Sequence, residues 1–407
     1  MAELRPFRAY RPPPPIAARV ASPPYDVVST AEARALAADD PYSFLHVSRP
    51  EIDLPVGTNE HDDAVYARGA RNLAALISDG SLVQDPEPHL YVYAQRMGDH
   101  QQVGVVGCAT VAEYVSGKIK KHENTRPDKE DDRTRHIEEL GAHDEPVFVT
   151  YLAEPLIDAI VSEAMTASPT YDLTTPDGVA HKLWVLGRAL GDEISARFAD
   201  VPALYMADGH HRSAAAARVH QRLTGDGGEH DVFPVVVFPH DQVKILPYNR
   251  VVKDTRGRSA DALLGELQRA LDVEPSPDGR SATPTAPKTF GLYLAGRWYR
   301  ARARPGTFDA ADPVASLDCS ICQDRILGPI FGIDDPRRDP HVDFVGGIRG
   351  AVELERRVDA GGFTLGIQLH PTRVEELIAV SDAGLLMPPK STWFEPKLRS
   401  GLFVHVF

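Results

Sequence analysis

The sequence predicts a mixed α/β fold, and three observations support that prediction. Apolar runs with strand character alternate along the chain with amphipathic and alanine-rich segments of helical character. The 407 residues are 43% hydrophobic and 25% charged, which is typical of globular proteins with a sizeable core. The chain shows no internal repeat and no heptad run. The order of the strands within the sheet stays open.

The first segment, residues 1–88, is expected to form an arm followed by helices. Prolines are frequent and helix formers are few over residues 5–29, which favours an extended chain with polyproline character. A helix is expected over "STAEARALAADD", with Ser29 or Thr30 as its cap. A second helix is expected over residues 62–77.

The second segment, residues 89–255, is expected to be the catalytic core. Its apolar runs and turn residues predict a strand pair joined by the turn "GDHQ" and a series of further strands and helices. The expected strands cover residues 89–97, 101–114, 145–153, 181–187, 203–206, 230–239 and 242–252. The expected helices cover residues 154–165, 190–200 and 213–219.

The remaining chain is expected to form two further segments. Residues 256–338 read as a small α+β insertion, with a helix over 259–272, a loop over 275–288 and a hairpin over 289–304. Residues 339–407 return to alternating strands and helices and end in the polar stretch "LMPPKSTWFEPKLRSG". This C-terminal segment is expected to complete the site.

Charge and hydropathy exclude two classes of partner. The 44 Lys and Arg against 58 Asp and Glu give a net charge of −14, which argues against general binding of DNA or RNA. The longest apolar runs fall far short of the ~20 residues of a membrane helix. The N-terminal segment has no apolar signal region and the cysteines are few, so we expect a cytoplasmic protein. The "CSIC" pair Cys319 and Cys322 is either a coincidence or a metal or redox site.

The stretch "ALYMADGHHRSAAAARVH" predicts an anion-binding turn between a buried strand and a helix. Gly209 allows a close approach of the backbone, and Arg212 offers a planar fork that matches phosphate oxygens. Asp208 is suited to hold Mg²⁺ or to orient a histidine. The alternative is a plain turn capped by Asp208, with solvated histidines.

The charged stretch from Lys118 to Glu139 carries 14 charges in 22 residues, seven of each sign. For Lys129–Glu139 a solvated helix held by i,i+4 pairs is the favoured interpretation. The preceding "KHENT" follows a strand-like pattern, and the carboxylate of Glu123 there is suited to accept a proton from a substrate hydroxyl.

The stretch "MPPKSTWFEPK" combines a stiff proline backbone with cationic and hydroxyl groups. Lys390, Ser391, Thr392 and Lys397 are the groups that a phosphate would contact. The alternative is a surface turn anchored by the aromatic pair Trp-Phe that follows them.

Together, the motifs "RPFRAYRP…SPPYDVVS", "KHENTRPDKEDDR", "ADGHHR" and "MPPKSTWFEPKLRSGL" resemble a large bacterial and archaeal family of formerly unknown function, of the DUF1015 type. The "DGHHR" segment also resembles the phosphate-binding motif of the ParB/sulfiredoxin superfamily, which includes an archaeal free-serine kinase. The resemblance implies a ParB/sulfiredoxin-like phosphate-binding core.

The resemblance further implies a kinase that phosphorylates the hydroxyl of free L-serine to O-phosphoserine. The donor would be pyrophosphate, ADP or ATP, with Mg²⁺ as cofactor, and a homodimer is left open. The implied residues fall into four groups: catalytic Glu123, Asp208 and His211; donor-binding Gly209, His210, Arg212, Lys390, Ser391, Thr392 and Lys397; substrate-binding His122, Thr125 and Arg133; and Asp208 as metal ligand. Because Arg212 is expected in a polar turn, its replacement by Ala is expected to leave folding intact.

Other functions stay open. A nucleotide- or phosphate-binding regulatory protein of the same superfamily, without kinase activity, is the main alternative. A switch of the ParB kind would need a DNA-binding module, and the sequence shows no basic recognition helix. A sulfiredoxin-like enzyme would need a cysteine beside the phosphate motif, and only folding could bring Cys108 there.

Overall fold

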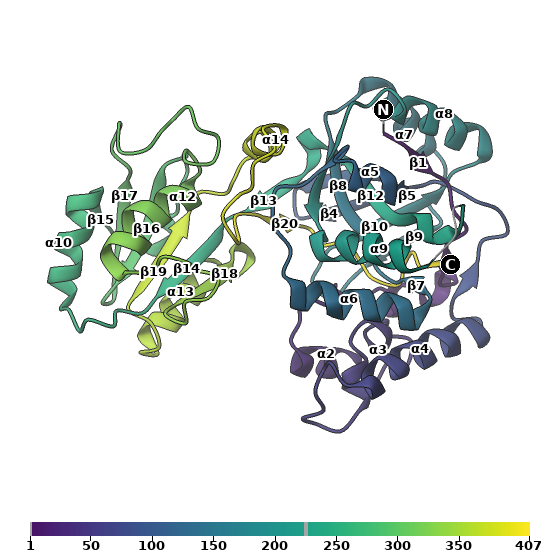
Figure 1. Ribbon diagram of the computed structural model, residues 1–407, viewed down its shortest axis with the longest axis horizontal. Coiled ribbons are helices and arrows are strands. Elements are labelled where there is room, and N and C mark those ends of the chain that lie inside the picture. Colours follow the sequence, from purple (N-terminus) through teal and green to yellow (C-terminus); the bar gives the residue numbers. More distant parts are fainter. Residues whose placement is uncertain (1, 224–226) are drawn as a thin grey trace. The chain divides into compact units, whose positions relative to one another are not determined.

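The computed structural model describes residues 2–223 and 227–407 and confirms a mixed α/β fold (Figure 1). The chain divides into two compact units. The first unit comprises residues up to Val243 together with Pro396–Phe407, and the second comprises Lys244–Glu395. Each unit has its own sheet.

The first unit is built on a nine-stranded mixed sheet. Strand β12 (Val232–Pro239) lies near its middle and is buried along its whole length, as its run of apolar residues predicts. The strand order is β6 (Ile119–Lys120), β11 (Leu204–Asp208), β8 (Val147–Tyr151), β12, β5 (His100–Thr110), β4 (Tyr91–Met97), β10 (Ala180–Val185) and β9 (Tyr171–Thr174), with β1 (Leu4–Arg5) paired to β5.

Two strand pairs in this sheet are parallel, namely β11 with β6 and β12 with β8. The other pairs are antiparallel, and β4 with β5 forms the expected hairpin. Its turn at Gly98–Asp99 is shorter than "GDHQ" suggests, because Gly98 adopts a positive φ of 60°.

The N-terminal segment combines extended stretches with short helices. The expected extended arm is present in part: β2 (Tyr10–Arg11) pairs with β3 (Val83–Gln84), but a helix that the sequence analysis missed interrupts it. The two expected helices are confirmed, and Ser29 caps the first in a capping box with Glu32. The helices are η1 (Pro14–Ile16), α1 (Ala17–Val20), α2 (Thr30–Ala37), α3 (Leu45–Ser48), η2 (Pro50–Asp53) and α4 (Asp63–Ser78).

Helices pack on the sheet around the largest apolar cluster of the chain. Residues of α7, α8 and α9 join the strands in this cluster. The four consecutive alanines of α9 are all buried, because small side chains let the helix approach both the sheet and helix α6 closely. These helices are α5 (Val111–Val115), α6 (Pro127–Leu140), α7 (Pro155–Ala164), α8 (Arg188–Phe198) and α9 (His210–Arg222).

The division into units differs from the four segments that the sequence suggests. The strand expected over 242–252 is in fact β13 (Lys244–Leu246) and β14 (Tyr248–Val252), and both belong to the second unit. There β14 pairs with β18 (Val342–Gly346) and β19 (Leu365–Leu369), so the expected insertion and most of the C-terminal segment share one sheet. The last twelve residues return to the first unit, where β21 (His405–Val406) pairs with β7 (Ala142–His143).

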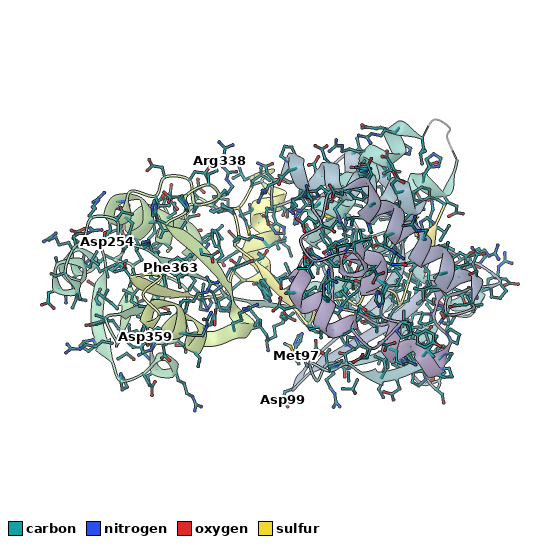
Figure 2. All side chains as sticks on the ribbon, turned by 90° about the horizontal axis from the view of Figure 1, so that it is seen from below. Met97, Asp99, Asp254, Arg338, Asp359 and Phe363 are labelled. Atoms are coloured by element: carbon teal, nitrogen blue, oxygen red, sulfur yellow. The ribbon has the colours of Figure 1, made fainter. Side chains whose placement is uncertain are left out.

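The second unit is a six-stranded antiparallel sheet with helices. The expected hairpin is confirmed as β16 (Thr289–Leu294) with β17 (Arg297–Arg302). Its apolar cluster includes Tyr293 and Trp298, with Phe363 (labelled in Figure 2) packed against it. The other elements are α10 (Ala260–Ala270), β15 (Asp272–Ser276), α11 (Gly279–Ala282), α12 (Asp318–Cys322), the π-helix η5 (Gln323–Phe331), η6 (Gly347–Arg349), α13 (Gly350–Asp359), α14 (Val374–Asp382) and β20 (Trp393–Glu395).

Two short 3-10 turns, η3 (Glu229–Asp231) and η4 (His240–Gln242), flank β12 in the first unit. Within the described parts of the chain, no helix is both long enough and apolar enough to cross a membrane.

Candidate functional site

A parallel strand pair places the "KHENT" and "DGHHR" motifs at the same edge of the sheet. Leu204 and Tyr205 of β11 lie opposite Ile119 and Lys120 of β6, and the two strands run in the same direction. The residues that follow the two strands therefore emerge together, although 85 positions separate them in the sequence. This pairing is the structural basis of the candidate site.

The start of helix α9 offers backbone N–H groups to an anion. Gly209 is the N-cap, with φ of +95°, and no side chain caps the helix. The first intrahelical N–H bond within this turn runs from Ser213 to the Gly209 carbonyl, as is general where a helix begins. Asp208 belongs to β11 and is not the cap, which excludes the plain capped turn that the sequence left open.

A lysine near the C-terminal end of the chain contacts the last residue of β11 at this edge of the sheet. The ammonium Nζ of Lys397 lies 2.7 Å from Oδ2 of Asp208, and Oδ1 of Asp208 accepts the N–H of Gly209 at 2.8 Å. The backbone of Lys397 is held by the Nε2 of Gln95 at 2.8 Å. Burial works to raise the pKa of Asp208, but the positive charges of Lys397 and Arg212 outweigh it and hold that pKa below its usual range.

The predicted role of Asp208 as a Mg²⁺ ligand stays a prediction, and the structure shows which groups already contact this carboxylate. One carboxylate oxygen is bound to an ammonium group and the other to a backbone N–H. A cation would have to compete with Lys397 for the same carboxylate, and hard divalent cations require oxygen ligands that are free to coordinate. Magnesium dependence itself stays a prediction.

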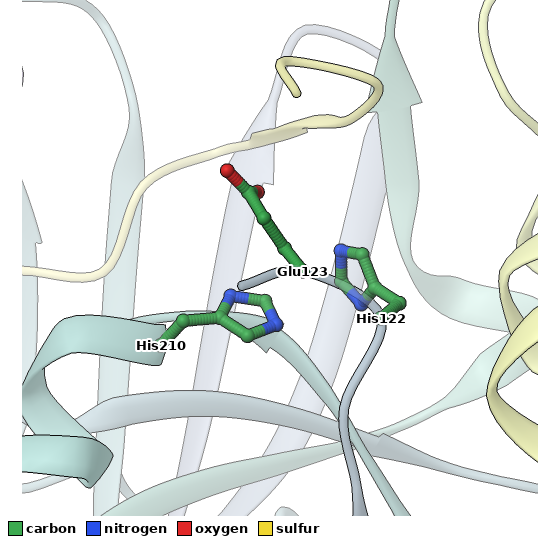
Figure 3. Close-up of side chains that lie close together, drawn as sticks. All are labelled: His122, Glu123 and His210. Atoms are coloured by element: carbon green, nitrogen blue, oxygen red, sulfur yellow. The ribbon is translucent and has the colours of Figure 1, made fainter. Parts of the chain in front are cut away.

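Two histidines and a glutamate form a cluster at the same edge (Figure 3). One ligand atom each from His122, Glu123 and His210 lie within 4.8 Å of one another. The two imidazole rings meet edge to face, with 4.5 Å between their centroids. Burial lowers the pKa of His122 to about 4 and that of His210 well below its usual value, so both rings are neutral near pH 7.

Arg212 lies in the polar turn expected for it, but its side chain is buried. It is 9% exposed, and its guanidinium donates to the carbonyl of Pro146. Its Nη1 lies 3.7 Å from Oε2 of Glu145, and its Nη2 lies 4.0 Å from Asp208. Replacement of Arg212 by Ala is therefore expected to destabilise the fold, because it leaves a buried carboxylate without a cation.

Glu145 is a buried acid that the sequence analysis missed. Its Oε1 accepts the N–H of Tyr25 at 3.0 Å and the hydroxyl of Ser400 at 2.7 Å. Burial raises the pKa of Glu145 to about 7, against the opposing charge of Arg212. The available signal was its position at the start of the strand expected over 145–153, where an acidic residue needs a partner to be buried.

Three further predicted residues lie on or near helix α6. The imidazole Nε2 of His211 accepts the N–H of Arg126 at 3.1 Å, so this predicted catalytic residue is tied to the start of α6. The predicted substrate ligand Thr125 donates its hydroxyl to Glu130. The guanidinium of Arg133 is buried, lies 2.8 Å from Asp132 and stacks over the ring of Tyr25 at 4.0 Å.

Helix α6 is not the fully solvated helix expected for Lys129–Glu139. Five of its residues are buried, four of them polar or charged, namely Asp132, Arg133, Thr134 and His136. His136 pairs with the buried carboxylate of Asp144 at 3.0 Å. The charged face is thus turned partly inward, where ion pairs compensate its burial.

The other predicted donor ligands belong to the second unit. Lys390 adopts a left-handed backbone with φ of 57°, and its Nζ lies 5.5 Å from the ring centroid of Tyr248. The Ser391 hydroxyl donates to the Pro388 carbonyl and lies 3.1 Å from the sulfur of Cys319. The phosphate role of Lys390, Ser391 and Thr392 stays a prediction.

The cysteines are buried thiols. Cys319 and Cys322 lie on α12, and burial raises both pKa values, that of Cys322 to about 12. Neither is disulfide-bonded. Cys108 lies within β5, opposite Arg5 and Pro234, and burial raises its pKa as well. None of the three has the exposed, low-pKa environment of a reactive cysteine.

Similar solved structures include three chains at low identity. A conserved hypothetical protein from Pyrococcus furiosus is 12% identical with a TM-score of 0.38, and the match covers 74% of this chain and 95% of that one. A free serine kinase in complex with AMP is also 12% identical with a TM-score of 0.38, over 72% and 91% of the two chains. SbnI with a C-terminal truncation, from Staphylococcus aureus, is 13% identical with a TM-score of 0.38, over 72% and 85%.

No curated protein matches the sequence. The sequence profile of DUF1015, described as a protein of unknown function, matches residues 4–320 and so includes three of the four motifs that suggested this family. The chain belongs to the DUF1015 family.

Proposed function

We propose that this protein is a phosphotransferase that transfers a phosphoryl group to the hydroxyl of free L-serine. The observation that carries the proposal is the meeting of Glu123 with the uncapped start of α9 at one edge of the sheet. An anion site beside a carboxylate is the combination that such a transfer requires, since the reaction depends on positioning and charge stabilisation.

Each group has a role in the proposal. The N–H groups at the start of α9 bind oxygens of the donor, which is pyrophosphate, ADP or ATP, and Mg²⁺ supplies charge neutralisation on the donor. The half-buried carboxylate of Glu123 orients the serine hydroxyl and accepts its proton. Lys397 contributes positive charge at the same edge, with Asp208 holding its ammonium in place.

The name of one similar structure, a free serine kinase bound to AMP, describes the same chemistry, but its likeness to this chain is too remote to argue from. The sequence motifs and the geometry of the first unit therefore support the proposal by themselves.

The test is a phosphoserine assay with L-serine and Mg²⁺, in which pyrophosphate, ADP and ATP are supplied separately. We expect product from one of the donors. Glu123→Gln is expected to lower turnover at least 100-fold with little change in donor affinity, because general-base catalysis contributes roughly 10²–10⁴-fold.

Asp128→Asn is the matched control, since Asp128 is an exposed acid on the same segment that pairs with Arg126 at 2.7 Å. It is expected to retain full turnover. Wild-type turnover in Glu123→Gln would remove Glu123 from the mechanism. Donor binding with no product from any donor would instead favour a phosphate- or nucleotide-binding regulatory protein.

A further inference from the structure

We infer that His122, Glu123 and His210 form a binding site for one divalent transition-metal ion such as Zn²⁺. The inference goes beyond the proposed function, which places only Mg²⁺, and it does not depend on that function. It rests on the geometry, burial and chemistry of the three side chains.

The geometry places three ligand atoms close enough for one ion. They lie within 4.8 Å of one another. Ligands at about 2.1 Å from a tetrahedral zinc ion are roughly 3.4 Å apart, so the ligand atoms need to approach one another by at most about 1.4 Å to bind one ion. Figure 3 shows the three side chains arising from two segments, with His122 and Glu123 adjacent in the chain and His210 at the start of α9.

The backbone restrains all three ligands. His122 follows β6 by two residues and His210 follows β11 by two residues, so the parallel pairing of these strands determines their spacing. A metal site built on adjoining strand ends is better defined than one on a free loop.

An unsatisfied buried nitrogen supplies an independent observation. His210 is 8% exposed, and its Nε2 is buried without a hydrogen-bond partner among the described residues. Buried polar atoms are normally satisfied, and an orphaned one points to an ion or water that the protein chain itself does not include. The nitrogen of a neutral imidazole is a common ligand for transition metals.

The chemistry of the three ligand groups favours a transition metal over Mg²⁺. Two imidazoles and one carboxylate suit Zn²⁺ and related ions, whereas Mg²⁺ prefers oxygen ligands only. The site therefore differs in chemistry from the magnesium role that the sequence analysis gave to Asp208. Three protein ligands also leave coordination positions open, as in catalytic rather than structural zinc sites.

A second cluster in the first unit provides a matched control. His220, His230 and Asp231 also place ligand atoms within 4.8 Å of one another. In this cluster Nδ1 of His220 already lies 2.9 Å from Oδ1 of Asp231, and all three residues are half-buried. The ligand atoms of a tetrahedral zinc ion lie roughly 3.4 Å apart, so the direct contact between these two atoms leaves no space for an ion between them.

The experiment measures metal binding by the full chain after treatment with a chelator, without serine or donor. Calorimetric titration with Zn²⁺ and the visible absorption of the Co²⁺-loaded protein report binding at one site per chain. We expect binding at a 1:1 ratio that excess Mg²⁺ does not displace. Glu123→Ala and His210→Gln are each expected to weaken Zn²⁺ binding at least tenfold, since even indirect supports of metal ligands are worth 10–100-fold.

His220→Gln is expected to leave the Zn²⁺ affinity unchanged. Glu123 is half-buried, so Glu123→Ala tests the site even where His210→Gln disturbs packing. Absence of 1:1 binding, displacement by Mg²⁺, or loss of binding in His220→Gln but not in Glu123→Ala would overturn the inference. A failed phosphoserine assay would leave it intact, because metal binding is read out separately.

Discussion

Replacement of Arg212 by Met is expected to destabilise the first unit in a pH-dependent way. The guanidinium of Arg212 and the carboxylate of Glu145 are both buried, with 3.7 Å between Nη1 and Oε2. Removing one partner of a buried pair typically costs about 3–5 kcal/mol, because the remaining charge is uncompensated. Here the variant can avoid part of that cost by keeping Glu145 protonated.

The sign of the pH dependence follows from the pKa of Glu145. In the wild type this pKa is raised to about 7 from a usual value of 4.5, so the folded state binds more protons than the unfolded state between these values. The contribution of Glu145 to the free energy of unfolding therefore falls by about 3 kcal/mol as the pH rises from 4.5 to 7. Without Arg212 the pKa rises further, so the fall continues above pH 7 by about 1.4 kcal/mol per pH unit.

The loss of stability in Arg212→Met is therefore expected to be about 1 kcal/mol larger at pH 8 than at pH 6. Urea unfolding followed by tryptophan fluorescence measures it. Trp184 is buried in β10 of the first unit, whereas Trp298 and Trp393 belong to the second unit, so replacing the latter two by Phe isolates the relevant signal.

Arg212→Lys is the control, since it keeps the positive charge and is expected to show a smaller difference between the two pH values. An equal loss at pH 6 and pH 8 in Arg212→Met would refute the reasoning, because Glu145 would then not depend on Arg212. Unchanged stability at both pH values would instead support the expectation from the sequence that the replacement of Arg212 leaves folding intact.

Two further substitutions test the same edge of the sheet. Lys397→Met is expected to lower the free energy of unfolding by about 2 kcal/mol at pH 7. Because the pKa of Asp208 is held low, this loss should shrink as the pH falls below 4. A loss that stays constant when unfolding is measured at acidic pH would contradict the pairing of Lys397 with Asp208. Gly209→Ala is expected to cost about 1–2 kcal/mol, since φ is +95° and a Cβ would lie 3.1 Å from the guanidinium of Arg212. Gly187→Ala is its control, because Gly187 also caps a helix but has φ of −63° and no atom within 4 Å of a Cβ. An equal decrease in melting temperature for both variants would argue against strain at Gly209.

Local patterns in the sequence predicted most elements but not their partners. The helix capped by Ser29, the strand over Val232–Pro239 and the hairpin over residues 289–304 are recognisable because capping residues, apolar runs and turn glycines act within a few positions. The assignment of Tyr248–Val252 to the second unit was not predictable in this way. It depends on hydrogen bonds to strands about 100 residues later.

For the candidate site too, the sequence predicted the residues but not their spatial neighbours. Sequence motifs alone singled out Glu123, the "DGHHR" turn and Lys397, because such polar residues have no place in an apolar core. Their meeting depends on the parallel pairing of β6 with β11 and on the return of the C-terminal segment to the first unit. The burial of Arg212 against Glu145 was also not predictable from the sequence, because distant parts of the chain decide whether a charge faces solvent or a buried partner. The sequence by itself thus determined the family, the local elements and the chemical groups available, and only the tertiary structure decided which charges compensate one another and which histidines share a site.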